Sequence, residues 1–342
     1  MLPPPLVRRV LCTPLLFALT ALVVLLFPFV YTPAALKRAL VRGGRDRVTR
    51  LLWFALAWGL LESRAVLACG LLWCRAPSRR SRGARYQDRH YEIIRRYVAG
   101  LHRVARRRFG LRIEIDGDRG PGAAAGDRPL IVLSRHAGPG DALLLVHHLL
   151  TDYGRRPRVV MKEALRLDPC IDIAANRLPN AFVGGGGAVE RIEALATGLG
   201  PRDALLIFPE GGNFTPDRRL RAIRRLMRLR RERDAVRAAR MRHVMPPRAG
   251  GSLAAIAAAP DADVVFVAHS GLEDMDSAGD VWRSLPLTAP VHAHWWRIAA
   301  ENVPRDPEAR SEWFHEQWER VDTWIDARHT AADGERPGSP EA

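Results

Sequence analysis

Residues 130–141 read LIVLSRHAGPGD, and this stretch is the most informative part of the chain. Its first five residues form a short apolar run typical of a buried strand, and the Gly-Pro-Gly turn ends that strand. Asp141 is a good N-cap for the apolar helix expected over 142–150. The stretch therefore predicts a strand, a turn and a helix of an α/β sheet. His136 then lies in the loop after the strand, where active sites gather in such sheets.

His136 and Asp141 are the candidate catalytic residues. A histidine in such a loop can take the proton of a bound alcohol, and a carboxylate five residues later can fix the tautomer of the ring and stabilise the imidazolium. The pair suits transfer of an acyl group from a thioester to a hydroxyl. Backbone N–H groups of the turn from Gly138 to Asp141 are candidate donors for the oxyanion of the intermediate.

The same spacing of histidine and aspartate occurs three times, although the 11 histidines of the chain predict it only about 0.7 times by chance. The second match, His147 with Asp152, lies inside the predicted helix, where a histidine is usually packed or solvated. The third match, His269 with Asp274, ends a strand-like run and is the stronger rival. Only His136 has a turn and a helix cap around its partner, so it is favoured.

A second strand and turn are predicted at residues 204–212. Residues 204–208 read ALLIF, which is the pattern of a buried strand, and the following PEGG breaks the run. Glu210 is therefore expected at the carboxyl end of a strand.

These motifs resemble those of the glycerolipid acyltransferase family, whose best-known members are 1-acyl-sn-glycerol-3-phosphate acyltransferases. The first block of the family matches His136 and Asp141, and its Phe-Pro-Glu-Gly block matches residues 208–211. Phe214-Thr215 and the Pro-Arg block at 247–251 resemble later blocks of the larger eukaryotic lysophospholipid acyltransferases. The resemblance spans about residues 90 to 328.

The resemblance implies an α/β fold with a mixed central sheet flanked by helices. It implies His136 as the general base on the acceptor hydroxyl, Asp141 as its partner, and Glu210 with its loop as the group that positions the acceptor headgroup. The acyl donor would be acyl-CoA or acyl carrier protein, and the acceptor a lysophospholipid, first of all 1-acyl-sn-glycerol-3-phosphate, which gives phosphatidic acid. No metal and no cofactor are expected, because the thioester is already activated. The candidate substrate-binding residues are Arg135, Lys162, Phe208, Pro209, Glu210, Gly211 and Arg248.

Two positions depart from the family pattern. Arg135 stands where the family has asparagine before the histidine, and Gly212-Asn213 stand where it has Thr-Arg. The arginine of that pair normally helps to hold the phosphate of the acceptor, so a different lysophospholipid or a glycolipid is an alternative acceptor. Lys162 is a candidate because the chain has only two lysines and this one follows a strand-like run.

The first 89 residues are expected to anchor the chain in the membrane. Residues 11–31 are almost wholly apolar over the length that crosses the hydrocarbon core. Residues 51–74 are apolar with a charged centre and have arginines on both sides, which favours a re-entrant or interfacial segment in the cytoplasmic leaflet. A single crossing then places the acyltransferase domain, residues 90–329, on the cytoplasmic side of the cell membrane, where acyl-CoA is found.

Two features are predicted near the C-terminus. Residues 307–328 have aromatic and aliphatic side chains at helical spacing, which indicates a helix that packs on the core. Residues 330–342 are rich in glycine, proline and charge and are expected to form a disordered tail.

The net charge of +16 is concentrated in residues 218–242, a predicted basic helix that holds twelve arginines among apolar side chains. Such a segment suits a membrane with anionic lipids. Nucleic acid is not favoured, since no zinc-finger, helix-turn-helix or RNP pattern is present. The alternative of another class is a noncatalytic, membrane-tethered basic protein that binds anionic lipid or nucleic acid through this segment, and it predicts that His136 is dispensable. The sequence predicts no oligomeric state.

Overall fold

The computed structural model of the chain forms two compact units. The first comprises residues 1–112, 143–188 and 281–289, and the second comprises residues 113–142, 189–280 and 290–342. The residues that the structure describes are 2–40, 46–75, 83–116, 127–138, 140–273, 275 and 277–334.

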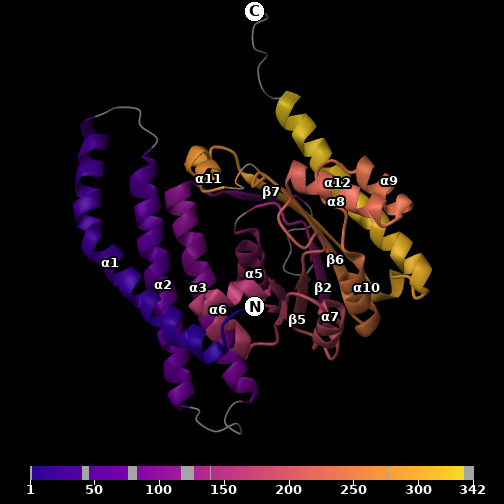
Figure 1. Cartoon of the computed structure of the whole chain (residues 1–342), viewed down its shortest axis with the longest axis horizontal. Helices are drawn as coiled ribbons and strands as arrows, with labels where there is room; N and C mark the ends of the chain where they lie inside the picture. The colour runs from indigo at the N-terminus through magenta and orange to yellow at the C-terminus, as the bar shows by residue number, and fades with distance from the viewer. Residues whose placement is uncertain are drawn as a thin grey trace, which may run out of the picture. The chain divides into compact units, whose positions relative to one another are not determined.

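The second unit is built on strands in the order β1-β7-β6-β2-β5 (Figure 1). These strands are β1 (Ile113–Asp116), β2 (Leu130–Ser134), β5 (Asp203–Ile207), β6 (Asp263–Ser270) and β7 (Val291–Ile298). Strand β2 pairs in parallel with β5 and β6, whereas β6 and β7 are antiparallel. The predicted mixed α/β sheet is confirmed, and so are the strands expected at 130–134 and 204–208. Because β2 and β5 are parallel neighbours, the loops that follow them meet at one edge of the sheet.

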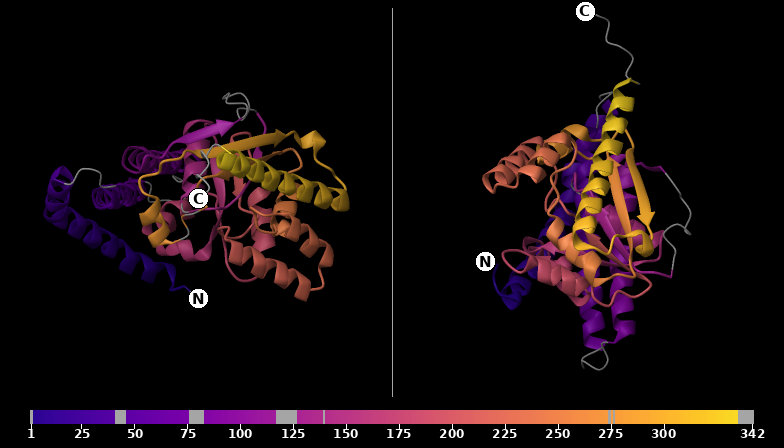
Figure 2. Two further views of the ribbon diagram at one scale, coloured as in Figure 1. Left: turned by 90° about the horizontal axis from the view of Figure 1, so that it is seen from above. Right: turned by 90° about the vertical axis from the view of Figure 1, so that its right-hand side faces the viewer.

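The long C-terminal helix α12 (Pro307–Gly334) covers one face of this sheet (Figures 1 and 2). Its side chains Phe314, Trp318, Val321 and Ile325 are fully buried. The ring of Phe314 lies 6.3 Å from that of Phe266 on β6. The predicted core-packing helix is therefore confirmed. It continues to Gly334, so the first residues of the expected tail are helical, and residues 335–342 lie outside the described part.

The other helices of the second unit are α7 (Ala188–Ala196), α8 (Pro216–Arg228), α9 (Glu232–Arg240), α10 (Ala249–Ala258) and the 3-10 helix η4 (Ala300–Asn302). The basic segment expected to be one helix is two, α8 and α9, which pack on each other. The break falls at Arg230, whose φ of 54° is incompatible with a continuous right-handed helix.

The first unit is mainly helical. Its long helices α1 (Pro5–Leu40), α2 (Arg47–Arg75) and α3 (Ala84–Phe109) pack side by side, α1 on α2 and α2 on α3 (Figure 1). Strands β3 (Arg156–Lys162) and β4 (Ala181–Val183) pair in parallel. The remaining helices are α5 (Asp141–Thr151), η2 (Glu163–Leu167), α6 (Pro169–Ile173), η3 (Ala175–Arg177) and α11 (Ala278–Ser284).

Helices α1 and α2 are both long and apolar enough to cross a membrane. Helix α1 exposes most of its apolar side chains, including Leu25 at 64% and Phe29 at 71%. Helix α2 is continuous through its charged centre, where Glu62 is buried inside the unit. That charge therefore faces protein and not the surroundings of the helix, so it does not by itself break a span. The re-entrant arrangement of residues 51–74 stays a prediction.

Candidate active site

His136 and Asp141 form a hydrogen-bonded pair in the loop after β2. Nδ1 of His136 lies 2.9 and 3.0 Å from the two carboxylate oxygens of Asp141. Since the carboxylate only accepts, Nδ1 carries the proton of the neutral ring and Nε2 is left as the basic nitrogen. The side chain of His136 is 20% exposed, whereas that of Asp141 is 3% exposed. The ring can therefore meet a substrate while its partner is shielded from water.

The carboxylate of Asp141 is fixed by its own loop. It accepts the N–H groups of Ala137 at 2.9 Å and Gly138 at 3.3 Å. Burial opposes its ionisation, but the hydrogen bond from His136 holds the pKa of Asp141 below its ordinary value. Asp141 is thus ionised at neutral pH and can stabilise an imidazolium. The N–H of Gly138, expected as an oxyanion donor, is used by this carboxylate.

His269, the rival histidine, converges on the same carboxylate. Its Nε2 lies 3.7 Å from Oδ2 of Asp141 and 3.1 Å from the carbonyl oxygen of Arg135. Burial lowers the pKa of His269, so the ring is neutral. The expected partner of His269, Asp274, lies outside the described residues. The remaining candidate, His147, is in α5 of the first unit, and its ring centre lies 4.2 Å from that of His102.

Glu210 supports the loop after β2, which holds His136. It follows β5 and is only 1% exposed. Its Oε1 accepts the N–H of His136 at 2.8 Å, and its Oε2 accepts the N–H of Met245 at 2.9 Å. Burial raises the pKa of Glu210 to about 8, against the opposing charge of Arg135. Both oxygens face the protein backbone, so the structure assigns Glu210 a supporting contact where the resemblance implied a headgroup contact.

Arg135 is fully buried. Its Nη1 donates to the carbonyl of His269 at 2.6 Å and to Oε1 of Glu273 at 2.5 Å. Its Nε and Nη2 donate to the carbonyl of His243 at 3.1 and 2.7 Å. The guanidinium lies 5.4 Å from the ring centre of Phe214. Every nitrogen of the guanidinium is engaged with the protein, so Arg135 faces inward, and the substrate contact expected for it stays a prediction.

Residues 242–245 contact both Arg135 and Glu210, through the carbonyl of His243 and the N–H of Met245. Asp322 of α12 holds this segment in place. The carboxylate of Asp322 accepts three successive N–H groups, from Arg242 at 3.0 Å, His243 at 2.6 Å and Val244 at 3.1 Å. Sequence reasoning missed Asp322, because it lies about 80 positions from its partners and belongs to no local motif. The only local signal for Asp322 was a carboxylate on the apolar face of a predicted helix.

The loop after β5 runs through Phe208, Pro209 and Gly211, and Arg248 packs on it. Gly211 and Arg248 are exposed, whereas Pro209 is buried. The ring centres of Phe208 and His136 are 4.6 Å apart. The N–H of Arg248 donates to the carbonyl of Pro209 at 2.8 Å, and its guanidinium passes over Gly211. Gly211 has a φ of 68°, and a Cβ there would lie 3.0 Å from Nε of Arg248. The glycine therefore makes room for an exposed cation beside the catalytic loop.

Gly211→Ala is expected to destabilise the protein by about 1–2 kcal/mol, because alanine is strained at positive φ. It should also displace the guanidinium of Arg248 and raise KM for an acceptor that carries phosphate. Gly198→Ala is the matched control, since Gly198 has the same φ of 68° and open space around its Cβ position. Thermal unfolding should shift similarly in both variants, whereas KM should rise in Gly211→Ala alone. Equal KM values in the two variants would remove Arg248 from the acceptor contact.

The structure thus brings all but one of the candidate residues together in the second unit. The exception is Lys162, which is exposed at the end of β3 in the first unit. Among the residues that the structure describes, no group of three or more His, Cys, Asp or Glu side chains is arranged to hold a metal ion.

A mixed α/β sheet that holds a histidine–aspartate pair and a Phe-Pro-Glu-Gly loop at the ends of neighbouring parallel strands defines an acyltransferase domain. Comparison of the sequence with family models gives the same class of protein. A model of the Acyltransferase family matches residues 101–271, which is half of the chain, and the chain belongs to this family. The family predicted from the motifs is confirmed.

The fold is similar to that of a solved acyltransferase. The crystal structure of the 1-acyl-sn-glycerophosphate (LPA) acyltransferase PlsC from Thermotoga maritima superposes with a TM-score of 0.53, over 86% of this chain and 100% of that chain. The two sequences are 16% identical, so this likeness concerns the fold alone. No curated protein sequence matches the chain.

Proposed function

We propose that the protein transfers a fatty acyl group from acyl-CoA or acyl carrier protein to the free hydroxyl of a lysophospholipid. The first candidate acceptor is 1-acyl-sn-glycerol-3-phosphate, which would give phosphatidic acid. The observation that carries the proposal is the pair of a partly exposed His136 and a buried, ionised Asp141, held in an Acyltransferase domain. Such a pair is suited to remove the proton from a hydroxyl.

The proposed reaction needs only this pair as its acid and base. Nε2 of His136 takes the proton of the acceptor hydroxyl while the oxygen attacks the thioester carbonyl carbon. Asp141 stabilises the resulting imidazolium through Nδ1. When the C–S bond of the tetrahedral intermediate breaks, the thiolate leaves and receives the proton from Nε2. An ester and a free thiol are formed, and His136 returns to its neutral tautomer.

Arg248 is the proposed contact for the phosphate of the acceptor. It is exposed, while the guanidinium of Arg135 is fully engaged inside the protein. The packing of Arg248 on Gly211 places its charge beside the catalytic loop. This position compensates for Gly212-Asn213, which stand in place of the Thr-Arg pair expected from the family.

Arg248→Gln is expected to raise KM about tenfold for lysophosphatidic acid, because a charge-assisted hydrogen bond contributes about 1.5–3 kcal/mol. KM for a monoacylglycerol, which lacks the phosphate, should not change. The measurement is transfer from labelled acyl-CoA to a panel of lysophospholipids, monoacylglycerol and glycolipids. Arg305→Gln, which removes an exposed arginine elsewhere in the same unit, is the control.

The same panel decides among the alternatives. A preference for another lysophospholipid or a glycolipid would keep the reaction and change the acceptor. If the wild-type protein transfers acyl groups to none of them, from either acyl-CoA or acyl carrier protein, the noncatalytic lipid-binding alternative replaces the proposal.

The proposed location is a cell membrane with anionic lipids, with the catalytic unit on the cytoplasmic side. The exposed apolar surface of α1 supports membrane association. Helix α8 adds Leu220 and Met227, exposed at 44% and 61%. The guanidinium groups of four exposed arginines of α8 make no hydrogen bond or ion pair with any residue that the structure describes, namely Arg221, Arg224, Arg225 and Arg228. Arginines near an anionic surface each contribute about 1 kcal/mol to binding.

A further inference from the structure

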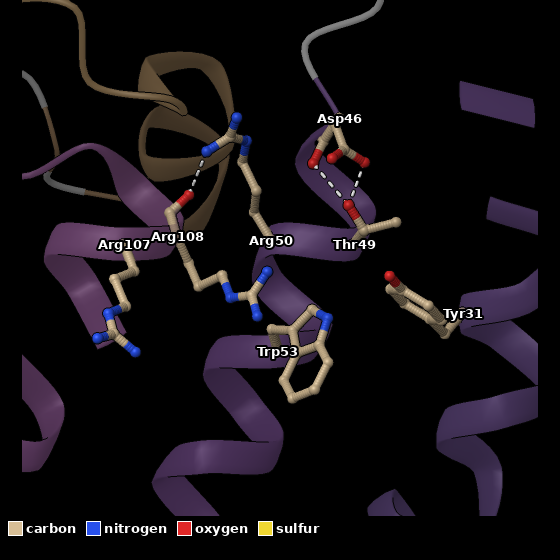
Figure 3. Close-up of a pocket in the computed structure, with 7 residues that line it drawn as sticks. All are labelled: Tyr31, Asp46, Thr49, Arg50, Trp53, Arg107 and Arg108. Carbon is tan, nitrogen blue, oxygen red and sulfur yellow. Dashed lines mark hydrogen bonds between the residues drawn. The ribbon is translucent and has the colours of Figure 1, made fainter. Parts of the chain in front are cut away.

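A cationic pocket lies among the ends of α1, α2 and α3 in the first unit (Figure 3). Its lining contains three arginines and a single carboxylate, so the pocket carries a net positive charge. The lining residues are Tyr31, Asp46, Thr49, Arg50, Trp53, Arg107 and Arg108. The catalytic mechanism uses none of them.

Two of the arginines are held in place by the helices themselves. The guanidinium of Arg108 lies 4.4 Å from the ring centre of Trp53, and Figure 3 shows it extended toward that ring. Nη1 of Arg50 donates to the carbonyl of Arg108 at 2.5 Å. Holding long cationic side chains in one position before a ligand arrives reduces the entropy lost on binding.

The third arginine, Arg107, keeps its donors for a ligand. Its guanidinium is exposed and makes no hydrogen bond or ion pair within the described part of the chain. Guanidinium groups with free N–H donors match the oxygens of a phosphate.

Two aromatic side chains, Tyr31 and Trp53, line the pocket and indicate which class of phosphate compound it binds. Phe27 stacks on Tyr31 at 5.1 Å and meets Trp53 edge-on at 4.9 Å. Tyrosine and tryptophan gather at the boundary between headgroups and hydrocarbon. On α1, Val24 lies two turns before Tyr31 on the same face of the helix and is 47% exposed. The pocket therefore stands where an exposed apolar helix surface meets a cluster of cations.

We propose that this pocket binds the phosphate of an anionic phospholipid headgroup, with the acyl chains of the lipid along the exposed surface of α1. Inorganic phosphate and the phosphates of coenzyme A share the same chemistry. A lipid is favoured over these soluble anions because only a lipid also covers the apolar surface beside Tyr31. The site goes beyond acyl transfer and does not depend on it.

The test is lipid retention by the full-length protein in a neutral detergent, measured by native mass spectrometry. The probes are dioctanoyl phosphatidylglycerol and dioctanoyl phosphatidylcholine. The anionic lipid is expected to bind at least about tenfold more tightly, and Arg107→Gln should weaken its binding about fivefold, the change expected for one arginine at an anionic surface. The double variant Arg107→Gln/Arg108→Gln should weaken it more than about tenfold.

Arg103→Gln/Arg106→Gln is the matched control, because it removes two exposed arginines of the same helix that do not line the pocket. It should leave binding within about twofold of the wild type, since these charges lie outside the pocket. Arg107→Lys should retain most of the binding, which separates loss of charge from loss of fold. His136→Ala should bind lipid as the wild type does, so failure of the acyl-transfer proposal is seen separately.

Three outcomes would overturn the proposal. The first is equal loss in the pocket variants and in the control pair, which would indicate a diffuse effect of charge. The second is equal binding of phosphatidylcholine and phosphatidylglycerol. The third is displacement of the lipid by inorganic phosphate or coenzyme A at the concentration of the lipid itself, which would identify a site for soluble anions.

Discussion

His136→Ala is expected to lower acyl transfer by about 10²- to 10⁴-fold, the usual contribution of a positioned general base. The ring is partly exposed and is paired with a buried, ionised carboxylate. Because the side chain is 20% exposed, its removal should change the unfolding temperature little. The measurement is the initial rate with labelled acyl-CoA, in membranes matched for the amount of protein.

His269→Ala is the contrasting variant. His269 is buried, and its Nε2 contacts the carbonyl of Arg135. Its loss should lower the unfolding temperature and reduce the rate less than the loss of His136 does. If His269→Ala alone abolished transfer while His136→Ala stayed active, the general base would be wrongly assigned.

Arg135→Gln is expected to destabilise the protein by about 3–5 kcal/mol, because breaking a buried ion pair leaves the other charge unpaired. The variant would leave Glu273 without its cation and the carbonyls of His243 and His269 without their donors. Burial opposes ionisation of Glu273, but a hydrogen bond from His329 and the charge of Arg135 lower its pKa, so Glu273 is a carboxylate in the wild type. Thermal unfolding in detergent should show a large fall.

Two further variants separate this supporting role from phosphate binding. Arg135→Lys keeps the charge but cannot span His243, His269 and Glu273 at once, so it should also unfold early. Glu273→Gln combined with Arg135→Gln should cost less than the sum of the single changes, because the two groups interact. If Arg135→Lys instead unfolded normally and raised KM for the acceptor, Arg135 would contact the phosphate.

Local patterns predicted the elements that local forces form. The apolar run at 130–134 became β2, and the apolar spacing over 307–328 became the buried face of α12. The pairing of His136 with Asp141 was also local, since a tight turn brings together groups five residues apart. Each of these features needs only the chain within one turn or one element.

The function of the buried charges was not predictable in this way. Glu210 was expected at the acceptor headgroup, yet its oxygens bind the N–H groups of His136 and Met245. Arg135 was a candidate for substrate binding, yet its guanidinium is fully buried and hydrogen-bonded to the protein. A charged residue in a motif can face either substrate or protein, and its direction depends on segments far away in the sequence.

Motifs in the sequence indicated the family, and the mixed α/β sheet was implied by that resemblance. The apolar runs, the turn and the five-residue spacing predicted β2, β5 and the pairing of His136 with Asp141, because these depend on local interactions. Only the tertiary structure decided which charges support the site and which remain exposed. Parallel pairing of β2 with β5 brings Glu210 to the backbone N–H of His136. Helix α12 brings Asp322 to His243, whose carbonyl accepts from Arg135. A buried carboxylate or guanidinium must be satisfied by whatever polar groups the fold places beside it, and those partners lie up to 138 positions away along the chain.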